Sequence, residues 1–449
     1  MLTFFAPLLV YILWYPVMLI TLFRVEVGIL FFIWLVPIIA VMQKIAEFPG
    51  GNNFADFLLI AICLGWFFKA LRENRNIFIR SPFNIVVILI VLGSILNLIR
   101  GYTFMDFSDE INMIRLQTWK NYMILPLLYF ISVNTIDKER LIKWIIIVIC
   151  ISLLAMDFNF HSTFRWIKAE HYSHSIRISG PFSFLGPNEL GIFFAMYTFL
   201  LLGISYFIDN KHFRYFLLLV CVCSAYPIMF SYSRSAYFCT IAGMLTLGIL
   251  KDRRILILLG TLIVLYSVIL PNSVVERIDM TFLNKEEIAD QQATDEVDVL
   301  DATIEKAGRK HLWEKAINYF EASPLLGIGF DTYRYQEGYI THSLYMKILS
   351  EQGIVGVIIF LIYVVTLLTQ SYRLFKRSVS KFGQGIGLGF FTATVTHLVG
   401  GFAGDQSLYY NFMAIFWIFI GIVARLNTFL SSQDSQSSTD FAVSNIKSI

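Results

Sequence analysis

The sequence predicts an all-α, polytopic membrane protein with about 13 transmembrane helices, within a range of about 12 to 14. Hydrophobic residues make up 57% of the 449 residues and charged residues 15%, and the mean hydropathy is +0.67. Soluble domains carry about 25% charged residues, so a soluble chain this apolar could not cover its surface. Uncharged runs near ~20 residues recur along the chain, and each is long enough to cross ~30 Å of hydrocarbon. The sequence lacks the ten-residue alternating segments typical of a β-barrel.

The apolar runs give the positions of the expected spans. A short hinge around Arg24 and Glu26 separates the first two. The spans lie at 4–23, 27–46, 54–71, 83–99, 121–135, 141–158, 188–208, 213–230, 236–250, 254–270, 353–369, 384–404 and 408–424.

Short basic clusters follow every second span, beginning with the third. Lysine and arginine in short loops favour the cytoplasmic side, so these clusters predict the orientation of the chain. The remaining loops then face outward, and 271–352 is the only long one. The basic clusters are Arg72, Arg75 and Arg80; Lys138, Arg140 and Lys143; Lys211 and Arg214; Lys251, Arg253 and Arg254; and Arg373, Lys376, Arg377 and Lys381. The other outward loops are 100–120, 159–187, 231–235 and 405–407.

This pattern divides the chain into four parts. Residues 1–270 hold the helices up to about the tenth, 271–352 form the long outward loop, and 353–425 hold the last helices. Residues 426–449 form a cytoplasmic tail, and their SSQDSQSSTD composition predicts disorder.

The long loop has two unlike halves. Between Pro271 and Glu305 there are ten Asp or Glu against two Lys or Arg. Such a composition is typical of a solvated, flexible lid. The second half predicts an amphipathic helix on the bilayer surface or packed under the loop. Its apolar residues at helical spacing are Leu312, Ala316, Tyr319 and Phe320.

Three outward arginines are candidate anion-binding residues. Arg234 lies in the very short turn FSYSRSAYF between two spans, Arg177 precedes the turn ISGPFSFLGPN, and Arg309 opens the amphipathic helix. A guanidinium beside hydrocarbon is costly and often functional, and its planar fork suits phosphate oxygens. The three could hold the diphosphate of a lipid carrier. The alternative is that each reaches lipid headgroups or pairs with a loop carboxylate.

His342 is the candidate catalytic residue. It stands in the segment ITHSLYMKILSEQG at the outer mouth of a span. A neutral imidazole can accept the proton of a sugar hydroxyl as that hydroxyl attacks. On spacing alone, an ordinary histidine at a helix start is the better interpretation. Tyr345 and Glu351 are nearby candidates for orienting the ring.

Other function classes find less support in the sequence. His171 and His174 lack a third metal ligand at recognisable spacing, so a plain loop is the favoured interpretation and no metal is expected. No Walker motif or dinucleotide fingerprint occurs. A net charge of +3 is too small to indicate nucleic acid. The five cysteines, all in apolar stretches, are interpreted as core residues.

Few carboxylates lie in the expected spans: Glu189 is at a helix start, Asp56 and Asp157 are near span ends, and Asp405 is in a turn. Proton- and sodium-driven transporters usually carry such groups within the spans, so this pattern argues against one.

Four motifs in order resemble the O-antigen ligase and polysaccharide polymerase family of bacterial envelopes. They are RISGPFSFLGPN, FSYSRSAYF, GRKHLWEKAINYFEASPLLGIGFDTY and THSLYMKILSEQGIVG. The resemblance covers roughly 175–370, whereas the N-terminal half matches only in being a set of spans. Two positions depart from the family pattern: Ser343 stands where Asn often follows the histidine, and Glu189 follows the Pro-Asn pair where a neutral residue is common.

The resemblance implies a glycosyltransferase-C-like fold in the bacterial inner membrane, with an active site facing the periplasm. It implies metal-independent, inverting transfer of a glycan from an undecaprenyl-diphosphate carrier, without a cofactor. Arg234 and Arg309 would bind the diphosphate, and His342 would act as general base on the acceptor hydroxyl.

The acceptor would be another lipid-linked glycan in a polymerase, or lipid A-core in a ligase. The acidic, extended outer loop has room for two glycan chains, which slightly favours a polymerase over a ligase. Membrane lipids and a chain-length regulator are further expected partners. A transporter or flippase of lipid-linked oligosaccharide, and a non-catalytic membrane scaffold, remain the alternatives.

Overall fold

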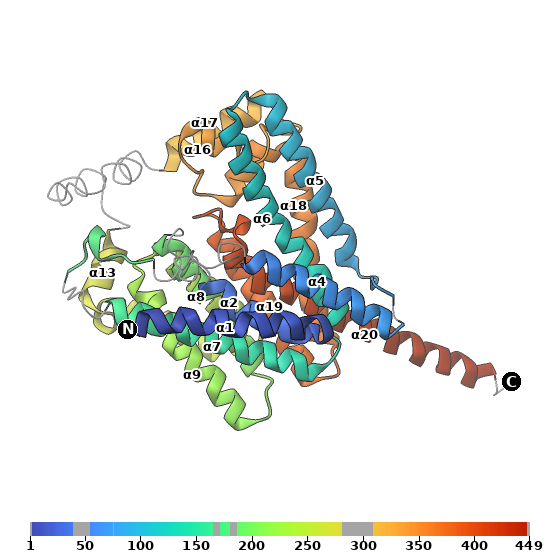
Figure 1. The fold of residues 1–449 in the computed structure, drawn as a ribbon. Helices are drawn as coiled ribbons and strands as arrows, with labels where there is room; N and C mark the ends of the chain where they lie inside the picture. Colours follow the sequence, from blue (N-terminus) through green and yellow to red (C-terminus); the bar gives the residue numbers. More distant parts are fainter. Residues whose placement is uncertain are drawn as a thin grey trace.

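The computed structural model describes residues 2–38, 54–74, 76–164, 171–179, 186–280 and 309–446. Across these residues the chain forms helices and no strand (Figure 1), which confirms the all-α, polytopic membrane fold. In chain order the helices are α1 (Leu2–Phe23), α2 (Val25–Leu35), α4 (Phe54–Arg72), α5 (Pro82–Phe104), α6 (Asp109–Thr135), α7 (Glu139–Phe164), α8 (Pro187–Ser205), α9 (Lys211–Phe230), α10 (Arg234–Leu250), α11 (Arg254–Val264), α12 (Tyr266–Ile269), α13 (Asn272–Asp279), α16 (Arg309–Ala322), α17 (Thr332–Glu337), α18 (Leu344–Arg377), α19 (Lys381–Gly400) and α20 (Tyr410–Ile446). Short 3-10 turns are η1 (Val36–Ile38), η3 (His174–Ile176) and η4 (Gln406–Leu408).

Six helices of the described chain are long and apolar enough to cross a bilayer. They are Pro82–Phe104, Glu139–Phe164, Pro187–Ser205, Lys211–Phe230, Leu344–Arg377 and Tyr410–Leu430. Four shorter apolar helices, Ile12–Phe23, Val25–Leu35, Arg234–Leu250 and Arg254–Val264, fall within other expected spans. The count of about 13 is therefore not confirmed, because several apolar runs form helices shorter than the ~17–25 residues that a span needs.

The centre of the bundle is α8, of which 83% is buried in its most apolar window. Glycines allow α19 to pack closely against it: a Cβ on Gly203 would lie 2.5 Å from the Cα of Gly389. Small residues at such contacts let the backbones of membrane helices approach each other. On another side α20 packs against α6, where Gly421 faces Ser132. These contacts form the frame on which the outer segments rest.

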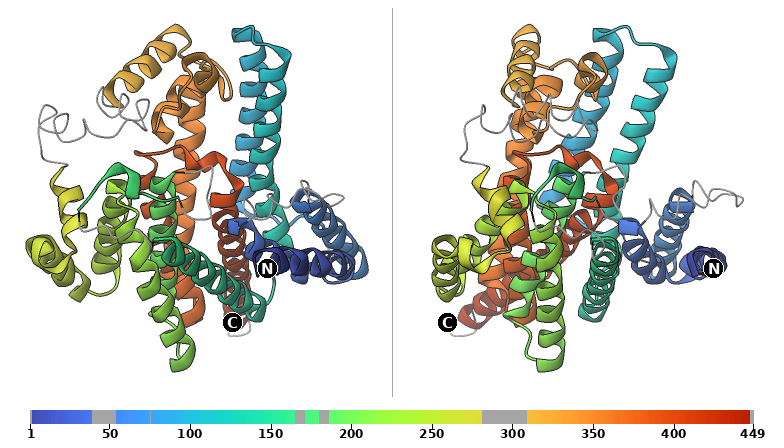
Figure 2. Two further views of the ribbon diagram at one scale, coloured as in Figure 1. Left: turned by 60° about the vertical axis from the view of Figure 1, so that its left-hand side comes forward. Right: turned by 90° about the vertical axis from the view of Figure 1, so that its left-hand side faces the viewer.

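Helices α5, α6 and α18 extend beyond the rest of the bundle and support α16 and α17 (Figures 1 and 2). This arrangement corrects the expectation of an outward loop over 100–120. Helix α5 continues to Phe104 and α6 begins at Asp109, so only 105–108 connect them. The Ser108 hydroxyl accepts a hydrogen bond from the Ile111 amide, and two acidic residues follow in the first turn. Such an N-cap starts a helix even where the sequence is too polar to form a span.

Helix α18 begins nine residues before the expected span at 353 and bends there. Gly353 has φ 61° and ψ −158°, which breaks the helical ladder. The freed amides of Ile354 and Val355 donate to the carbonyls of Pro324 and Leu325, at 2.8 and 3.2 Å. Turn 324–329 thus inserts at the bend, as expected where another backbone replaces helical hydrogen bonds. The segment before Gly353 is a short helical arm, and the predicted span follows it.

The long loop 271–352 is largely helical where the structure describes it, since α13, α16 and α17 lie in it. Most of its acidic half, predicted to be a flexible lid, falls in 281–308, outside the described residues. The prediction of disorder in the tail differs from the structure, because α20 continues to Ile446. Residues 426–446 contain no Gly or Pro. Nothing in their sequence therefore ends the helix that the buried turns before them have already formed.

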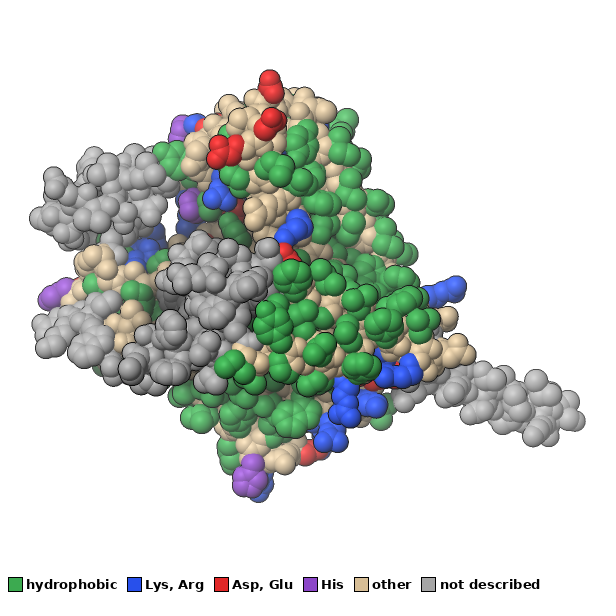
Figure 3. Space-filling model, in the orientation of Figure 1, with side chains coloured by type: hydrophobic (Ala, Val, Ile, Leu, Met, Phe, Trp, Pro, Cys, Tyr) green, Lys and Arg blue, Asp and Glu red, His purple; other side chains and the backbone are tan. Residues whose placement is uncertain are grey.

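Figure 3 shows hydrophobic side chains over the flank formed by α5 and over the middle of the same face. Basic side chains gather toward the lower right of that view. A broad apolar flank is what a surface in contact with lipid requires.

Candidate functional site

His342 lies where the start of α18 meets the turn that joins α19 to η4. The amide of Leu344 donates to the carbonyls of Gly401 and Gly404, at 2.8 and 3.1 Å. His342 itself is half-buried and has φ 48°, in the left-handed region that a side chain rarely adopts. Such a conformation costs on the order of 1–3 kcal/mol and persists only where the surroundings impose it. The fold therefore holds this histidine in a defined position.

The turn of 323–332 packs along the arm of α18 through its backbone. The amides of Ile328 and Gly329 donate to the carbonyls of Ser350 and Glu351, at 3.0 and 2.9 Å. Gly327 and Gly329 have φ of 64° and 102°. A Cβ on Gly329 would lie 2.2 Å from the Gly101 amide nitrogen, so only glycine fits there.

Two arginines of the helical hairpin α5–α6 fasten this turn. Arg100 donates to the carbonyl of Gly327 at 3.3 Å and to the hydroxyl of Ser323 at 3.2 Å. Arg115 is fully buried and donates to the carbonyl of Phe330 from two nitrogens, at 3.1 and 2.9 Å. Neither residue was a candidate in the sequence, because both fall in the stretch expected to be a loop.

A buried ionic cluster lies beside His342. The ammonium of Lys347 is 2.8 Å from a carboxylate oxygen of Asp331, 3.3 Å from Glu351 and 3.6 Å from Asp405. Each of the four side chains is at most 6% exposed. Glu351 also accepts the backbone amides of Asp331 and Tyr333, at 3.0 and 3.3 Å. The cluster joins the arm of α18, turn 323–332 and the turn before η4, which are distant in sequence.

Tyr345 and Glu351, the sequence candidates for orienting His342, have described partners elsewhere in the site. The Tyr345 hydroxyl donates to the carbonyl of Leu398 at 2.6 Å, and the Glu351 carboxylate binds Lys347 and two backbone amides. Both residues belong to the arm of α18 that follows His342, and their orienting role stays a prediction.

Arg334 stands at the outer edge of the cluster and is exposed. Burial works against its charged form, but the carboxylate of Asp331 and, further away, that of Asp405 raise the pKa of its guanidinium above the usual value. Nearby, burial and the charge of Asp405 raise the pKa of Tyr409 to about 12, so its hydroxyl stays protonated. Neutral hydroxyls and a guanidinium beside buried carboxylates make this edge polar.

The second part of the site is the turn at the start of α10. Arg177 donates to the side-chain oxygen of Asn188 at 2.7 Å and, at 3.5 Å, to the carbonyl of Ser231. It thus links the Pro-Asn motif, which begins α8, to the Ser-Arg turn. Ser233 caps α10 through the Ala236 amide, and Arg234 is the first, half-buried residue of the helix. The structure therefore places Arg177 and Arg234 at the same turn.

Arg277 of α13 joins this turn, which sequence reasoning missed. Its side chain is 4% exposed, it donates to the carbonyl of Tyr232 at 3.2 Å, and it lies over the ring of Tyr172. Tyr232 has φ 51° and its hydroxyl is 3.0 Å from that of Ser273. Arg277 lies in the acidic half of the long loop, where the sequence predicted a flexible lid. No local pattern in that half indicated a buried arginine.

Glu189 connects the two parts of the site. It follows Asn188 in the first turn of α8, and a Cβ on Gly404 would lie 3.2 Å from its carboxylate. Arg177 and Asp405 both lie within electrostatic range of this carboxylate. Glu189 is one of the two positions that depart from the family pattern. It lies near both the turn at the start of α10 and the ionic cluster around Lys347.

Arg309 is carried by a different helix. It begins α16, which is the amphipathic helix expected from the sequence and packs against α18. Leu312 and Ala316 are its buried residues, and the carbonyl of Leu312 accepts the Tyr333 hydroxyl at 2.8 Å.

The described residues contain no group of three or more His, Cys, Asp or Glu that could hold a metal ion. His171 lies 2.7 Å from a carboxylate oxygen of Glu276, which gives that histidine a structural partner on α13.

Comparison with known families gives one match: residues 219–361 fit the family described as O-Antigen ligase. The matched region contains Arg234, Arg277, Arg309 and His342, whereas Arg177 precedes it. The match confirms the family resemblance, and three of the four motifs lie within the matched region. No curated protein matches the chain.

Proposed function

With residues 219–361 identified as an O-antigen ligase domain, we propose that the protein is a membrane glycosyltransferase. It moves a glycan from an undecaprenyl-diphosphate carrier onto a hydroxyl of an acceptor glycan. The family match supports a glycan-transferring membrane enzyme. The donor, the acceptor and the roles of the residues are proposed from the chemistry of the site.

In the proposed reaction the acceptor oxygen attacks the anomeric carbon from the side opposite the diphosphate. A new carbon–oxygen bond forms as the bond to the diphosphate breaks, and undecaprenyl diphosphate leaves with the bonding electron pair. The acceptor proton passes to the neutral imidazole of His342, which acts as general base. The configuration at the anomeric carbon is inverted.

Arg234, Arg177 and Arg309 are the proposed ligands of the diphosphate, and Arg277 is added to them. Guanidinium groups stabilise the negative charge that grows on the leaving diphosphate. Because a diphosphate ester is already a good leaving group, positioning and charge neutralisation supply most of what the protein must contribute.

The observation that carries the proposal is the strained backbone of His342 beside a network that reaches the arginine turn. His342 has φ 48°, and the Glu189 carboxylate interacts electrostatically with both Arg177 and Asp405. Strained backbone conformations of this kind cluster at active sites and ligand-binding segments. The alternating basic clusters support a site on the periplasmic face of the inner membrane.

Purified protein in detergent, given an undecaprenyl-diphosphate-linked oligosaccharide with and without lipid A-core, tests the proposal. A ladder of products from donor alone would identify a polymerase, which we favour. A size shift only with lipid A-core would identify a ligase. Bound donor without any transfer would contradict both and favour a transporter of the lipid-linked glycan.

A further inference from the structure

Turn 324–329 carries two neighbouring leucines that are exposed, although they lie outside every expected span. The side chains of Leu325 and Leu326 are 66% and 44% exposed. The backbone beside them is held in place, because Arg100 of α5 donates to the carbonyl of Gly327 at 3.3 Å. The sequence from 322 to 330, ASPLLGIGF, contains no charged side chain. An uncharged, ordered turn with two exposed leucines at its tip indicates an apolar partner.

The two leucines extend an apolar strip of α18. The amides of Ile354 and Val355 donate to the carbonyls of Pro324 and Leu325, so the turn lies directly against the start of the apolar part of α18. Exposed apolar side chains follow along one face of that helix at helical spacing. They are Ile354, Ile358, Leu361, Ile362 and Val365. A surface suited to lipid along α18 therefore continues onto the turn.

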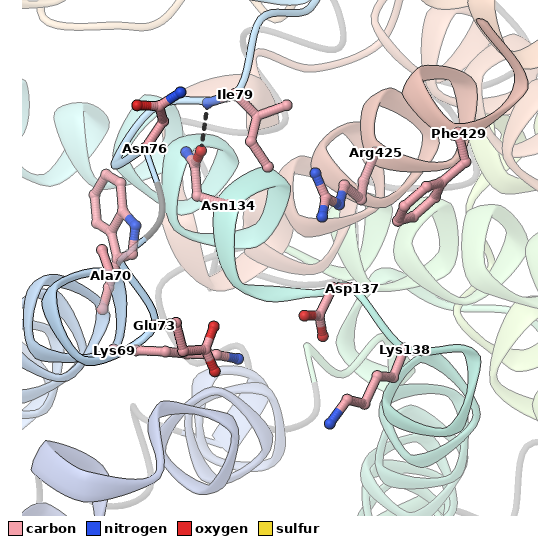
Figure 4. A pocket seen from close by; sticks show the side chains of 11 residues that line it. Lys69, Ala70, Glu73, Asn76, Ile79, Asn134, Asp137, Lys138, Arg425 and Phe429 are labelled. Atoms are coloured by element: carbon pink, nitrogen blue, oxygen red, sulfur yellow. Dashed lines mark hydrogen bonds between the residues drawn. The ribbon is translucent and has the colours of Figure 1, made fainter. Parts of the chain in front are cut away.

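Helix α5 indicates the depth of the turn in the bilayer. At the start of α5 the Ile79 amide donates to the side-chain oxygen of Asn134 at 2.7 Å, beside a pocket with charged side chains (Figure 4). Those charged side chains are Lys69, Glu73, Asp137, Lys138 and Arg425. The roughly 18 residues from Pro82 to Arg100 span about 27 Å, close to the ~30 Å of the hydrocarbon layer. The turn at Arg100 therefore lies at the edge of this layer that is opposite the charged pocket.

Helix α18 gives the same depth independently. The roughly 19 residues from Ile354 to Arg373, where the basic cluster of this helix begins, span about 28 Å. A basic cluster marks one edge of the hydrocarbon layer, so Ile354 and the turn bonded to it lie at the other edge. Acyl chains are within reach of exposed side chains at this depth.

We propose that Leu325 and Leu326, at the tip of turn 324–329, insert into the edge of the lipid bilayer and anchor the long loop there. The partner is the hydrocarbon of the leaflet on the side of His342. The turn is bonded to the arm of α18 through its backbone, so the anchor also fixes the arm that follows His342 relative to the bilayer. This role goes beyond glycan transfer and does not depend on it.

Collisions of a nitroxide spin label with oxygen and with a water-soluble nickel chelate test the proposal, because oxygen concentrates in hydrocarbon and the chelate stays in water. The label is attached to Leu326→Cys in the full chain, in vesicles of phosphatidylethanolamine and phosphatidylglycerol. Cys63 and Cys223, the two cysteines that are not buried, are replaced by Ala in every sample. Ile358→Cys on the apolar strip of α18 and Lys310→Cys on an exposed position of α16 are the matched controls.

We expect the label on Leu326→Cys to collide more with oxygen than with the chelate, as on Ile358→Cys, and the label on Lys310→Cys to show the reverse preference. A preference for the chelate on Leu326→Cys would overturn the proposal. Shielding from both reagents would also overturn it, since protein rather than lipid would then cover the turn. Leu325→Cys provides a second label that should prefer oxygen, and an unchanged melting temperature in detergent verifies that each variant is folded.

Discussion

The segment around His342 and the turn around Arg234 both present polar groups near the outer end of the bundle, but they are held differently. The first rests on a cluster of opposite charges that are almost fully buried, centred on Lys347. In the second, Arg177 and Arg277 donate to neutral amide and carbonyl oxygens. A buried ionic cluster tolerates little change because its charges cannot reach water. The guanidinium groups of this turn are permanently charged, and their planar donors suit the oxygens of an anion. The proposed base therefore rests on a rigid support, whereas the proposed diphosphate site contains guanidinium groups that can bind an anion.

The largest expected effect on stability is that of Lys347→Met. It leaves three buried carboxylates without their common cation, and breaking a buried pair in this way costs about 3–5 kcal/mol. Thermal unfolding in detergent measures the loss. Lys315→Met is the matched control, because Lys315 pairs with Glu337 at a more exposed position, where an ion pair is worth below about 1 kcal/mol. Equal destabilisation by both variants would mean that burial of the cluster is not what distinguishes the His342 segment.

Gly329→Ala should have the next largest effect. Its φ of 102° is strained for alanine, and the added Cβ would lie 2.2 Å from the Gly101 amide nitrogen. Strain and overpacking together predict about 2–5 kcal/mol of destabilisation. Gly338→Ala separates the two causes, since Gly338 has φ 76° but nothing within 4 Å of its Cβ. If both variants lost the same stability, close packing of the turn against α5 would not matter.

Arg234→Lys tests the other side of the comparison. The substitution keeps the positive charge but removes the planar fork, so the fold should remain and donor affinity should fall about ten- to a hundredfold. Binding of the lipid-linked donor, measured in detergent, reports the change. Arg253→Lys, on an exposed residue of the basic cluster before α11, provides the control. Donor affinity like that of the unmodified protein would remove the bidentate role from Arg234.

The smallest effect concerns Glu337 under α16. Burial opposes its ionisation, but hydrogen bonds from Lys315 and Tyr319 hold the pKa of its carboxyl below the usual value. A carboxyl whose pKa is lowered by folding stabilises the fold above its unfolded pKa of about 4.3 and loses this contribution as the pH falls through the folded value. Glu337→Gln should therefore cost less than about 1 kcal/mol at pH 7, and progressively less in acid. A difference in melting temperature that grew as the pH fell would contradict this assignment.

Residues that belong to local motifs could be found from the sequence, whereas those that act through distant contacts could not. His342 and Arg234 stand in short patterns next to apolar runs, and α16 shows helical spacing, so each was predicted. Lys347 pairs with Asp405, which lies beyond α18 and α19, and no local pattern indicates such a pair. Sequence reasoning did not identify Arg115, because polar residues at the start of α6 predicted a loop. In the structure an N-cap and contacts to Phe330 make this segment helical. Hydropathy predicted the helices well, but not their bends or lengths, which depend on packing.

The most direct test of the account is to measure donor binding and glycan transfer side by side for the unmodified protein and His342→Ala. Loss of a general base predicts a fall in transfer of about 10²–10⁴-fold. Donor affinity and melting temperature should stay unchanged, because the substitution alters neither the proposed diphosphate ligands nor the Lys347 cluster. Full transfer activity in His342→Ala would contradict the proposed mechanism.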